Sequence, residues 1–346
     1  MSGQAIYLKD NKFSEIVMRL LPYEEKEREV LVKREEDTDL KFGLDPYKRP
    51  TKDILDYGVM NLDKPEGPSS HQISAYAKKI IGVDKAGHSG TLDPKVTGVL
   101  PIAFGKATRV TQSLLTAGKE YVCLMRLHSN IDPGEIHKVM KKFTGTIKQL
   151  PPVRSAVKRR PRYRKVYYLD ILDINGKDVL FIVGTEAGTY IRKLCHDIGQ
   201  KLGSGAHMFE LRRTRAGPFK EDTLHTLQEL TDAYHFYKEK GEDELLRKII
   251  LPPEEAVSHI PKIWVLDTSV DTLCHGATLK VPGIAKLHSG IEPDMTVAVM
   301  TLKEELVMTA TAKLASNVVL KKDHGIAAKP DQVFMKRGTY PKIEKG

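Results

Sequence analysis

One acidic residue, Asp93, stands in a loop of unusual backbone chemistry, Gly-His-Ser-Gly-Thr-Leu-Asp-Pro over residues 87–94. Gly87 and Gly90 can adopt positive φ angles without a steric penalty, and Pro94 biases Asp93 towards an extended backbone. A loop that bends sharply and then fixes one carboxylate is suited to presenting a reactive group. Taken alone, such a segment is more often a turn that carries a helix-capping or surface aspartate, so evidence from the rest of the chain is needed to favour a catalytic role.

The chemistry open to Asp93 is limited by its neighbours in the sequence. Glycosidases use a pair of carboxylates, and no second acid accompanies Asp93 in this loop. A triad of His88, Ser89 and Asp93 is disfavoured, because residues so close on one loop rarely converge as base, nucleophile and orienting acid. The two glycines lack the Gly-Lys-Ser/Thr ending of a phosphate-binding loop. What remains is one carboxylate acting on a substrate bond that is already predisposed to break.

Length, charge and cysteine content narrow the class of protein. The chain has 346 residues, more than one core usually holds, so we expect two domains. Its net charge of +10 points to a polyanionic partner, which for a cytoplasmic protein is usually nucleic acid. Three scattered cysteines indicate a reducing compartment and neither a disulfide framework nor a zinc site. Because no signal-type start and no apolar run of 18 residues occur, we expect a cytoplasmic protein without a membrane segment.

Hydrophobic periodicity predicts both helices and strands between residues 57 and 260. The apolar face of the first helix, which Ser69 or Ser70 should cap, is expected to comprise Ile73, Tyr76, Ala77, Ile80 and Ile81. A turn at Asn175-Gly176 should join two antiparallel strands. The expected strands are 59–62, 121–127, 166–174, 179–183 and 206–215, and the expected helices are 70–81, 110–115, 136–143, 191–202, 226–239 and 242–250.

The two ends of the chain differ from this central region. The first 50 or so residues are dense in charge and lack a period, which predicts an extension lying against another part of the protein. Beyond about residue 260, short apolar runs at 263–266, 279–281, 296–300, 306–309 and 333–335 predict a small β-barrel or sandwich. The expected division is an extension at 1–56, a central domain at 57–260, a β domain at 261–340 and a tail at 341–346.

The run from Gly87 to Leu100 resembles the catalytic motif of the TruB family of pseudouridine synthases, most closely its dyskerin branch in archaea and eukaryotes. Four further segments occur in the order typical of that family: Asp63-Lys64-Pro65, Lys119-Glu120-Tyr121, Gly188-Thr189-Tyr190-Ile191-Arg192 and Leu211-Arg212-Arg213. The resemblance implies an α+β fold with a mixed, mainly antiparallel sheet in the catalytic domain and a C-terminal β-barrel PUA domain. The amino-terminal extension would pack on that PUA domain.

The resemblance also implies roles for individual residues. Asp93 would be the catalytic carboxylate, acting at the ribose C1′ or as a base on the sugar while uracil detaches, turns and rejoins through C5. Arg192 would pair with Asp93 and hold its orientation. Tyr121 would stack on the extruded base, and Tyr190 would lie near the Asp–Arg pair. Three further positions would shape the substrate pocket: His88, Lys64 and Leu211.

A basic segment at 158–165 stands where bacterial relatives have a long RNA-clamping insertion. It is compatible with salt-sensitive phosphate binding, or with the solvated edge of a hairpin. The resemblance to a PUA domain is carried by His275-Gly276-Ala277 and Val281-Pro282-Gly283-Ile284, although Pro293-Asp294 replaces the Gly-Asp of many members. The residues expected to contact RNA are Lys158, Arg159, Arg160, Arg162, Arg164, Lys165, Arg212, Arg213, Gly276 and Gly283.

The function that the resemblance implies is isomerisation of uridine to pseudouridine in rRNA directed by box H/ACA guide RNA, and at uridine 55 of tRNA. The implied partners are the guide RNA, these substrates, a small zinc-ribbon-like protein, a β-barrel protein that promotes turnover and a kink-turn-binding ribosomal-type protein. Neither a cofactor nor a metal is expected. The alternatives are a standalone tRNA modifier, a non-catalytic RNA-binding scaffold and an Asp-based nucleotide hydrolase. The scaffold predicts loss of Asp93 or Arg192, and the hydrolase lacks metal ligands.

Overall fold

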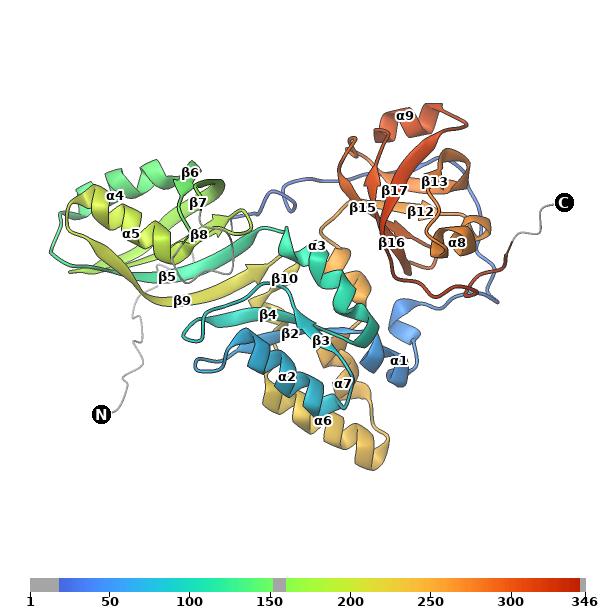
Figure 1. The fold of residues 1–346 in the computed structure, drawn as a ribbon, viewed down its shortest axis with the longest axis horizontal. Coiled ribbons are helices and arrows are strands. Elements are labelled where there is room, and N and C mark those ends of the chain that lie inside the picture. Colours follow the sequence, from blue (N-terminus) through green and yellow to red (C-terminus); the bar gives the residue numbers. More distant parts are fainter. Residues whose placement is uncertain (1–18, 152–159, 343–346) are drawn as a thin grey trace.

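Two β-rich bodies lie along the long axis of the molecule in the computed structural model, which describes residues 19–151 and 160–342 (Figure 1). The larger body is built on a ten-stranded sheet whose main path is β11-β2-β4-β9-β5-β8-β7-β6, with β3 beside β4 and β10 beside β9. The smaller body holds a seven-stranded sheet in the order β1-β14-β12-β15-β16-β17-β13. The predicted α+β class with a C-terminal β domain is confirmed.

The larger sheet is mainly antiparallel, as expected. The parallel contact is between β4 and β9, where Thr97 lies opposite Arg212 and Gly98 opposite Arg213. This contact joins two segments of the recognised motifs that are more than a hundred residues apart in the chain. The strands are β2 (Val59–Lys64), β3 (Ala86–His88), β4 (Thr97–Phe104), β5 (Lys119–Leu127), β6 (Gly145–Gln149), β7 (Arg162–Asn175), β8 (Asp178–Thr185), β9 (Ala206–Ala216), β10 (Phe219–Lys220) and β11 (Ile250–Leu251).

Helices cover the two halves of this sheet separately. In one half, residues of α2 and α6 such as Ile73 and Leu230 pack on Leu100 of β4. In the other half, Leu194 of α5 packs on Phe181 of β8. The helices of the larger body are α1 (Thr51–Asp56), α2 (Ser70–Ile81), α3 (Thr111–Leu115), α4 (Pro133–Met140), α5 (Ile191–Leu202), α6 (Leu227–Lys240) and α7 (Glu244–Ile249), with short 3-10 turns η3 (Gly105–Val110) and η4 (Lys141–Phe143).

Helix α2 begins as expected but differs on one face. Ser69 caps it in a reciprocal arrangement with Gln72, which satisfies backbone N–H groups of the first turn. Tyr76, however, was wrongly assigned to the apolar face, because its side chain is 45% exposed. A tyrosine carries a polar hydroxyl that allows it to stand at the edge of a helix–sheet contact, which hydrophobic period alone does not distinguish.

The smaller body was predicted less completely. Strand β14 and helices α8 and α9 were missed, and β17 begins and ends earlier than the expected run at 333–335. The extension supplies β1, which pairs antiparallel with β14 from Val30 opposite His288 to Val32 opposite Lys286. The elements are β1 (Val30–Val32), β12 (Lys262–Val265), α8 (Asp267–Cys274), β13 (Leu279–Lys280), β14 (Ile284–His288), β15 (Thr296–Met300), β16 (Leu306–Ala312), α9 (Ser316–Lys321) and β17 (Ile326–Val333).

A shared hydrophobic cluster joins the two bodies. Val59 and Leu114 of the larger body pack in one cluster with Trp264, Met300 and Leu306 of the smaller one. Burial of these side chains at a common contact holds the β domain in a defined place against the larger sheet.

His259 predicts a pH dependence of stability. Its ring is buried edge-on to Tyr23 at 5.7 Å between ring centroids, and burial lowers its pKa to about 4. The unfolded chain binds a proton near pH 6.5 while the folded chain does not, so stability present above that pH is lost as the pH falls towards 4. We expect His259→Phe to remove about 2 kcal/mol of the destabilisation between pH 7 and pH 5, measured by urea unfolding. Exposed His324→Phe is the control and should leave the dependence unchanged.

Candidate active site

The loop that carries Asp93 connects β3 to β4 and is held firmly on the side that precedes the carboxylate. Leu92 is buried, its N–H donates to Oγ of Ser70 at 2.8 Å, and its carbonyl accepts from the same hydroxyl at 3.1 Å. Of the two loop glycines only Gly90 uses a positive φ, 95°, whereas Gly87 lies in β3 without one. The first residue of α2 thus fixes the backbone next to Asp93.

The side that follows Asp93 is held by a buried lysine. Lys64 is fully buried and its Nζ donates to the carbonyls of Pro65, Pro94 and Val96 at 2.8, 2.9 and 2.9 Å. Burial lowers the pKa of this ammonium, and the nearby carboxylates of Glu66 and Asp93 oppose that shift. Lys64 therefore acts on the site by positioning the loop, while its expected part in shaping the substrate pocket stays a prediction.

Removing this lysine tests the positioning role. Lys64→Met would leave three carbonyls without their donor, so we expect the free energy of unfolding to fall by about 2 to 4 kcal/mol. At temperatures where the variant stays folded, the turnover number for RNA should fall more than the affinity for RNA. Lys95→Met, in the same loop but exposed, is the matched control and should remain within about 0.5 kcal/mol of wild type. Equal unfolding midpoints for the two variants would contradict the role assigned to Lys64.

The expected pairing of Asp93 with Arg192 is present. Arg192 is the second residue of α5, and its Nη2 forms an ion pair with Oδ2 of Asp93 across 99 positions of sequence. The side chains of Arg192 and Asp93 remain 56% and 51% exposed, so a ligand can reach the pair. The geometry joins the start of α5 to the β3–β4 loop at an accessible carboxylate.

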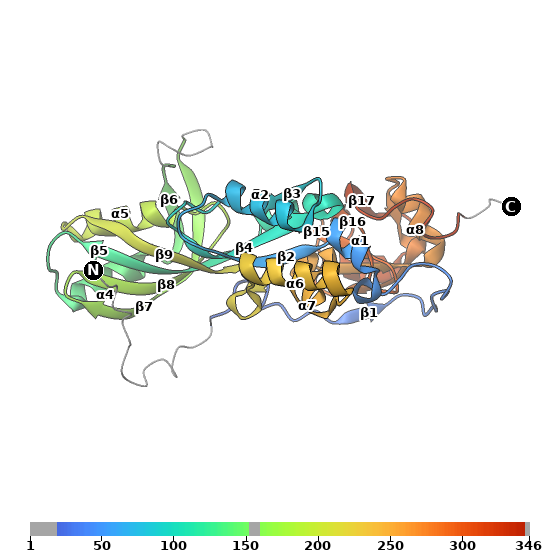
Figure 2. The ribbon, with the colours of Figure 1, turned by 90° about the horizontal axis from the view of Figure 1, so that it is seen from below.

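The start of α5 is itself held by a residue that the sequence did not indicate. The side-chain amide of Gln149, at the end of β6, donates to the carbonyl of Tyr190 at 3.1 Å and accepts from its N–H at 3.0 Å. The guanidinium of Arg164 lies against Gly188, which has a φ of 79° and would bring a Cβ to 3.3 Å from Nε. The base of the β6–β7 ribbon, which projects from the larger body in Figure 2, therefore abuts the turn that presents Tyr190 and Arg192.

Tyr121 and Leu211 lie where the two halves of the larger sheet meet. Both are partly buried and pack on both hydrophobic clusters of that body. Tyr121 lies opposite Arg213 in the β5–β9 pair, and Arg213 in turn donates to the carbonyls of Val99 at 2.7 Å and Gly90 at 3.3 Å. Tyr121 is thereby connected through one side chain to the loop that carries Asp93.

Arg213 was wrongly predicted to contact RNA, whereas the same expectation for Arg212 stays a prediction. Arg213 is 2% exposed and its guanidinium bonds loop and strand carbonyls, so it is structural. Arg212 forms a two-pronged ion pair with Asp63, at 3.0 and 3.1 Å, and a further one with Glu221. Basic residue type alone cannot reveal such internal partners, because they come from distant strands and turns.

The other predicted RNA contacts divide by position. Arg160, before β7, and Lys165 are exposed. Arg162 and Arg164 are half-buried, on the face of β7 opposite to Lys165, and Lys158 and Arg159 lie outside the described residues. Gly276 has a φ of 83° with open space around it, a geometry that leaves room for a ligand. Gly283 is explained by packing, since a Cβ there would come to 2.5 Å from Oγ of Ser269.

His88 has the character of a neutral, space-filling ring. Both of its ring nitrogens are buried without a hydrogen-bond partner among the described residues, and the ring meets His71 edge-on at 4.8 Å. Burial, with help from the charges of His71 and Arg213, lowers the pKa of His88 to about 4. A ring that stays neutral is ill suited to general acid–base catalysis near neutral pH, and the part of His88 in shaping the pocket stays a prediction.

Metal-binding clusters, membrane-spanning helices and cysteine contacts were sought among the described residues. No cluster of three or more His, Cys, Asp or Glu side chains could hold a metal ion within 19–151 and 160–342, and none of the helices there could cross a bilayer. Cys123 and Cys195, far apart in sequence, bring their Sγ atoms to 3.6 Å in the core.

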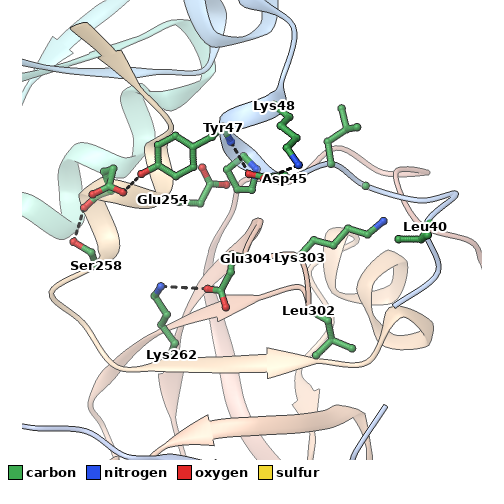
Figure 3. Close-up of a pocket in the computed structure, with 14 residues that line it drawn as sticks. Leu40, Asp45, Tyr47, Lys48, Glu254, Ser258, Lys262, Leu302, Lys303 and Glu304 are labelled. Atoms are coloured by element: carbon green, nitrogen blue, oxygen red, sulfur yellow. Dashed lines mark hydrogen bonds and ion pairs between the residues drawn. The ribbon is translucent and has the colours of Figure 1, made fainter. Parts of the chain in front are cut away.

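A cavity of about 640 Å³ elsewhere in the molecule is not part of this site. It lies between the extension, the smaller body and residues Glu254, Glu255 and Ser258 of the larger body, and no residue of the Asp93 loop or α5 lines it (Figure 3). Its charged groups are largely satisfied within it, as in the pair of Lys262 and Glu304 at 3.3 Å and the bond from Tyr47 to Glu255. We interpret this cavity as incomplete packing where these parts of the protein meet.

The chain matches known protein families in four consecutive segments. Residues 20–74 match the DKCLD (NUC011) domain and residues 78–191 the TruB family pseudouridylate synthase N-terminal domain. Residues 192–258 match the tRNA pseudouridylate synthase B C-terminal domain, and residues 261–334 the PUA domain. The ion pair of Asp93 with Arg192 joins the second segment to the third.

Individual relatives are similar over nearly the whole chain. A protein of Thermococcus onnurineus named probable tRNA pseudouridine synthase B is 58% identical over 94% of this chain and 98% of its own length. A protein of Nanoarchaeum equitans with the same name is 56% identical over 93% of this chain and 92% of its own length. The crystal structure of a Cbf5-Nop10-Gar1 complex contains a chain that is 57% identical, with a TM-score of 0.90 over 94% of this chain and 99% of that one. A structure of an H/ACA RNP bound to a substrate RNA containing 2′-deoxyuridine gives 55% identity and a TM-score of 0.88, over 94% and 99%.

Proposed function

Because the chain belongs to the TruB family of pseudouridylate synthases, which are isomerases that act on RNA, we propose that Asp93 is its catalytic carboxylate and Arg192 the residue that orients it. The observation that carries this proposal is the exposed ion pair between the two side chains. The backbone of the loop is held by Ser70 before Asp93 and by Lys64 after it, while the Asp93 side chain stays half exposed. Such preorganisation places one acid against one bond of a bound nucleoside.

The reaction breaks the bond from N1 of uracil to C1′, rotates the base and forms a bond from C5 to C1′; C5 then gives up its proton to solvent, and N1 takes up a proton from solvent. Asp93 either attacks C1′ or removes a proton from the sugar, and in both cases uracil leaves with charge that its carbonyls delocalise. No strong separate acid is then needed. Arg192, paired with Asp93 before substrate arrives, restricts the carboxylate to one orientation.

The target uridine has to leave its stack before Asp93 can reach its sugar. We assign the replacement stacking surface to Tyr121, whose ring lies at the junction of the two sheet halves and next to Arg213, the residue that holds Gly90. Tyr190 immediately precedes α5, so its ring is positioned by the bonds of its backbone to Gln149. Leu211 and His88 would complete the apolar wall of the pocket.

We further propose that the target is rRNA chosen by a box H/ACA guide RNA in the cytoplasm, with partner proteins of the kinds in the solved complexes, Nop10 and Gar1, and a kink-turn-binding protein. Two arguments support this: the similarity to chains of H/ACA particles, and the family resemblance, by which only a short segment stands here where bacterial relatives carry a long RNA clamp. Catalysis is assigned to residues 57–260 and guide docking to 261–340. The extension at 1–56 would brace the latter through the β1–β14 pair.

A direct test compares uridine isomerisation in an rRNA fragment with and without its guide RNA and partner proteins. Multiple turnover of the rRNA fragment is expected only with guide RNA present. Modification of that fragment by the chain alone, at an equal rate and position, would contradict guide dependence while leaving the isomerase intact.

A second target is favoured by the names of the relatives, which are tRNA pseudouridine synthases. We propose uridine 55 of tRNA as a substrate that needs no guide. The assay measures tritium released from RNA labelled at C5 of uridine. A tRNA transcript that lacks only uridine 55 should release no tritium from the T-arm. Turnover of the intact transcript without guide RNA would support this tRNA activity. No turnover of that transcript would contradict it.

The exposed cations of the ribbon predict the salt dependence of RNA binding. Removing one cation that binds a phosphate lowers the slope of log affinity against log salt by about 0.7 for a single strand. Replacing Arg160 and Lys165 by glutamine should therefore reduce that slope by roughly 1 to 2, measured by fluorescence anisotropy at salt concentrations from about 50 to 300 mM. Lys248→Gln, on α7, is the control and should leave the slope unchanged, since its ammonium pairs with Glu244 on its own helix.

A further inference from the structure

Half of β7 has an open edge. β6 pairs with β7 only from Arg162 to Val166, where Val166 lies opposite Gly145. From Tyr168 onward β7 pairs with β8 on one side, and no described strand lies on the other. Backbone N–H and C=O groups along such an edge are a template for another strand.

A groove runs along this open edge. Its volume is about 690 Å³, and five consecutive residues of β7, Tyr167–Ile171, line it. Successive side chains of a strand point to opposite faces of a sheet, so a groove that touches all five must follow the strand edge rather than either face. The remaining walls come from α4, from η4 and from Arg19 of the extension.

Four of the five β7 residues that line the groove lie in the regular part of the strand. The register against β8 shifts between Val166 and Tyr168 and again between Ile171 and Asp173. Such irregularities commonly end strand pairing. The stretch from Tyr168 to Ile171 lies between them and is free of shifts, so it can accept a short added strand.

The lining of the groove is amphipathic and positively charged. Leu169 and Ile171 supply apolar surface, whereas Lys138 and Lys141 contribute positive charge from α4 and η4. The charge of Arg19, a further lining residue, is offset by Asp170 at 3.1 Å. Lys138 has Glu135 at 3.6 Å, while Lys141 forms no ion pair with any described residue.

We propose that this groove binds an extended, acidic segment of a partner protein, which adds to β7 as an extra strand. Main-chain hydrogen bonds to the open edge would supply the affinity, and the alternate side chains of the segment would meet Lys141 on one side and the apolar residues on the other. A peptide fits better than RNA, because the strand edge offers donors and acceptors in the repeat of a β-ladder. The proposal is independent of the catalytic assignment, since no residue of the Asp93 site lines the groove.

The test uses the full chain and three synthetic ten-residue peptides in which valine alternates with glutamate, glutamine or lysine. We expect the glutamate peptide to bind most tightly by fluorescence anisotropy, and Lys141→Glu to weaken it about fivefold. Lys142→Glu is the matched control, because Lys142 neighbours it in η4 but lines a different cavity. Thermal unfolding of both variants should match wild type.

Two further measurements separate strand addition from simple charge attraction. Methylating the backbone nitrogens on one edge of the glutamate peptide should abolish binding, while methylating those of the other edge should not. Amide hydrogen exchange should slow within 167–171 when the unmodified peptide is bound. Equal binding of all three peptides, no slowing of exchange, or stronger binding of a single-stranded RNA twelve-mer that Lys141→Glu weakens would each overturn the proposal.

Discussion

Replacing Asp93 by asparagine is expected to lower the rate of tritium release from RNA labelled at C5 of uridine by at least about a thousandfold. Asparagine has nearly the same shape but carries no charge and cannot serve as nucleophile or base. The ion pair with Arg192 disappears as well. RNA affinity should stay within a few fold of wild type, because phosphate contacts elsewhere supply most of it.

The matched control for Asp93→Asn is Asp84→Asn, an exposed aspartate shortly before the loop, which should retain full activity. Residual turnover of the Asp93 variant near the wild-type rate would remove the role assigned to this carboxylate. Loss of RNA binding in parallel with loss of turnover would instead mean that the substitution disturbs the loop.

Replacing Arg192 by alanine is expected to lower the turnover number by roughly a hundredfold to a thousandfold, with little change in KM. Without the guanidinium the Asp93 side chain samples several rotamers, and a misplaced reacting group costs about two orders of magnitude in rate. Single-turnover measurements with saturating enzyme would separate this effect from substrate binding.

Two further substitutions test the role of Arg192. Arg192→Lys keeps the charge but loses the planar fork, so its activity should lie between those of alanine and wild type. Lys193→Ala, the next residue of α5, should remain active because its partner is Asp197 on the same helix. Normal turnover by Arg192→Ala would show that the ion pair is dispensable.

Elements whose signals are local were predicted well. Helix α5 was predicted at 191–202, ending at Gly203, and the helix spans these residues with Gly203 at a φ of 73°. The period of its apolar residues and the conformational freedom of glycine are properties of neighbouring residues, so they can be read along the chain. Helix α8 was missed because its eight residues, Asp267–Cys274, contain three β-branched side chains, which have low helix propensity, although Val270, Leu273 and Cys274 do stand at helical spacing.

The chemistry of the site was likewise predictable in part. The motif around Asp93 and its pairing with Arg192 followed from the resemblance, and the structure contains that pair. Nothing in the sequence indicated that Gln149 would hold the backbone of Tyr190, or that Lys64 would bind three carbonyls around the loop. These residues carry no motif of their own beyond the segment in which they stand.

The sequence by itself determined which residues can do the chemistry, because the type of a side chain and the conformations of its neighbours are local properties. Only the tertiary structure decided what each charged group does. Arg192 reaches an exposed carboxylate, whereas Arg213 is buried on loop and strand carbonyls and Arg212 is neutralised by Asp63. The reason is that the partner of a charge is set by which strands meet across about a hundred residues, and that meeting depends on burial of the whole core.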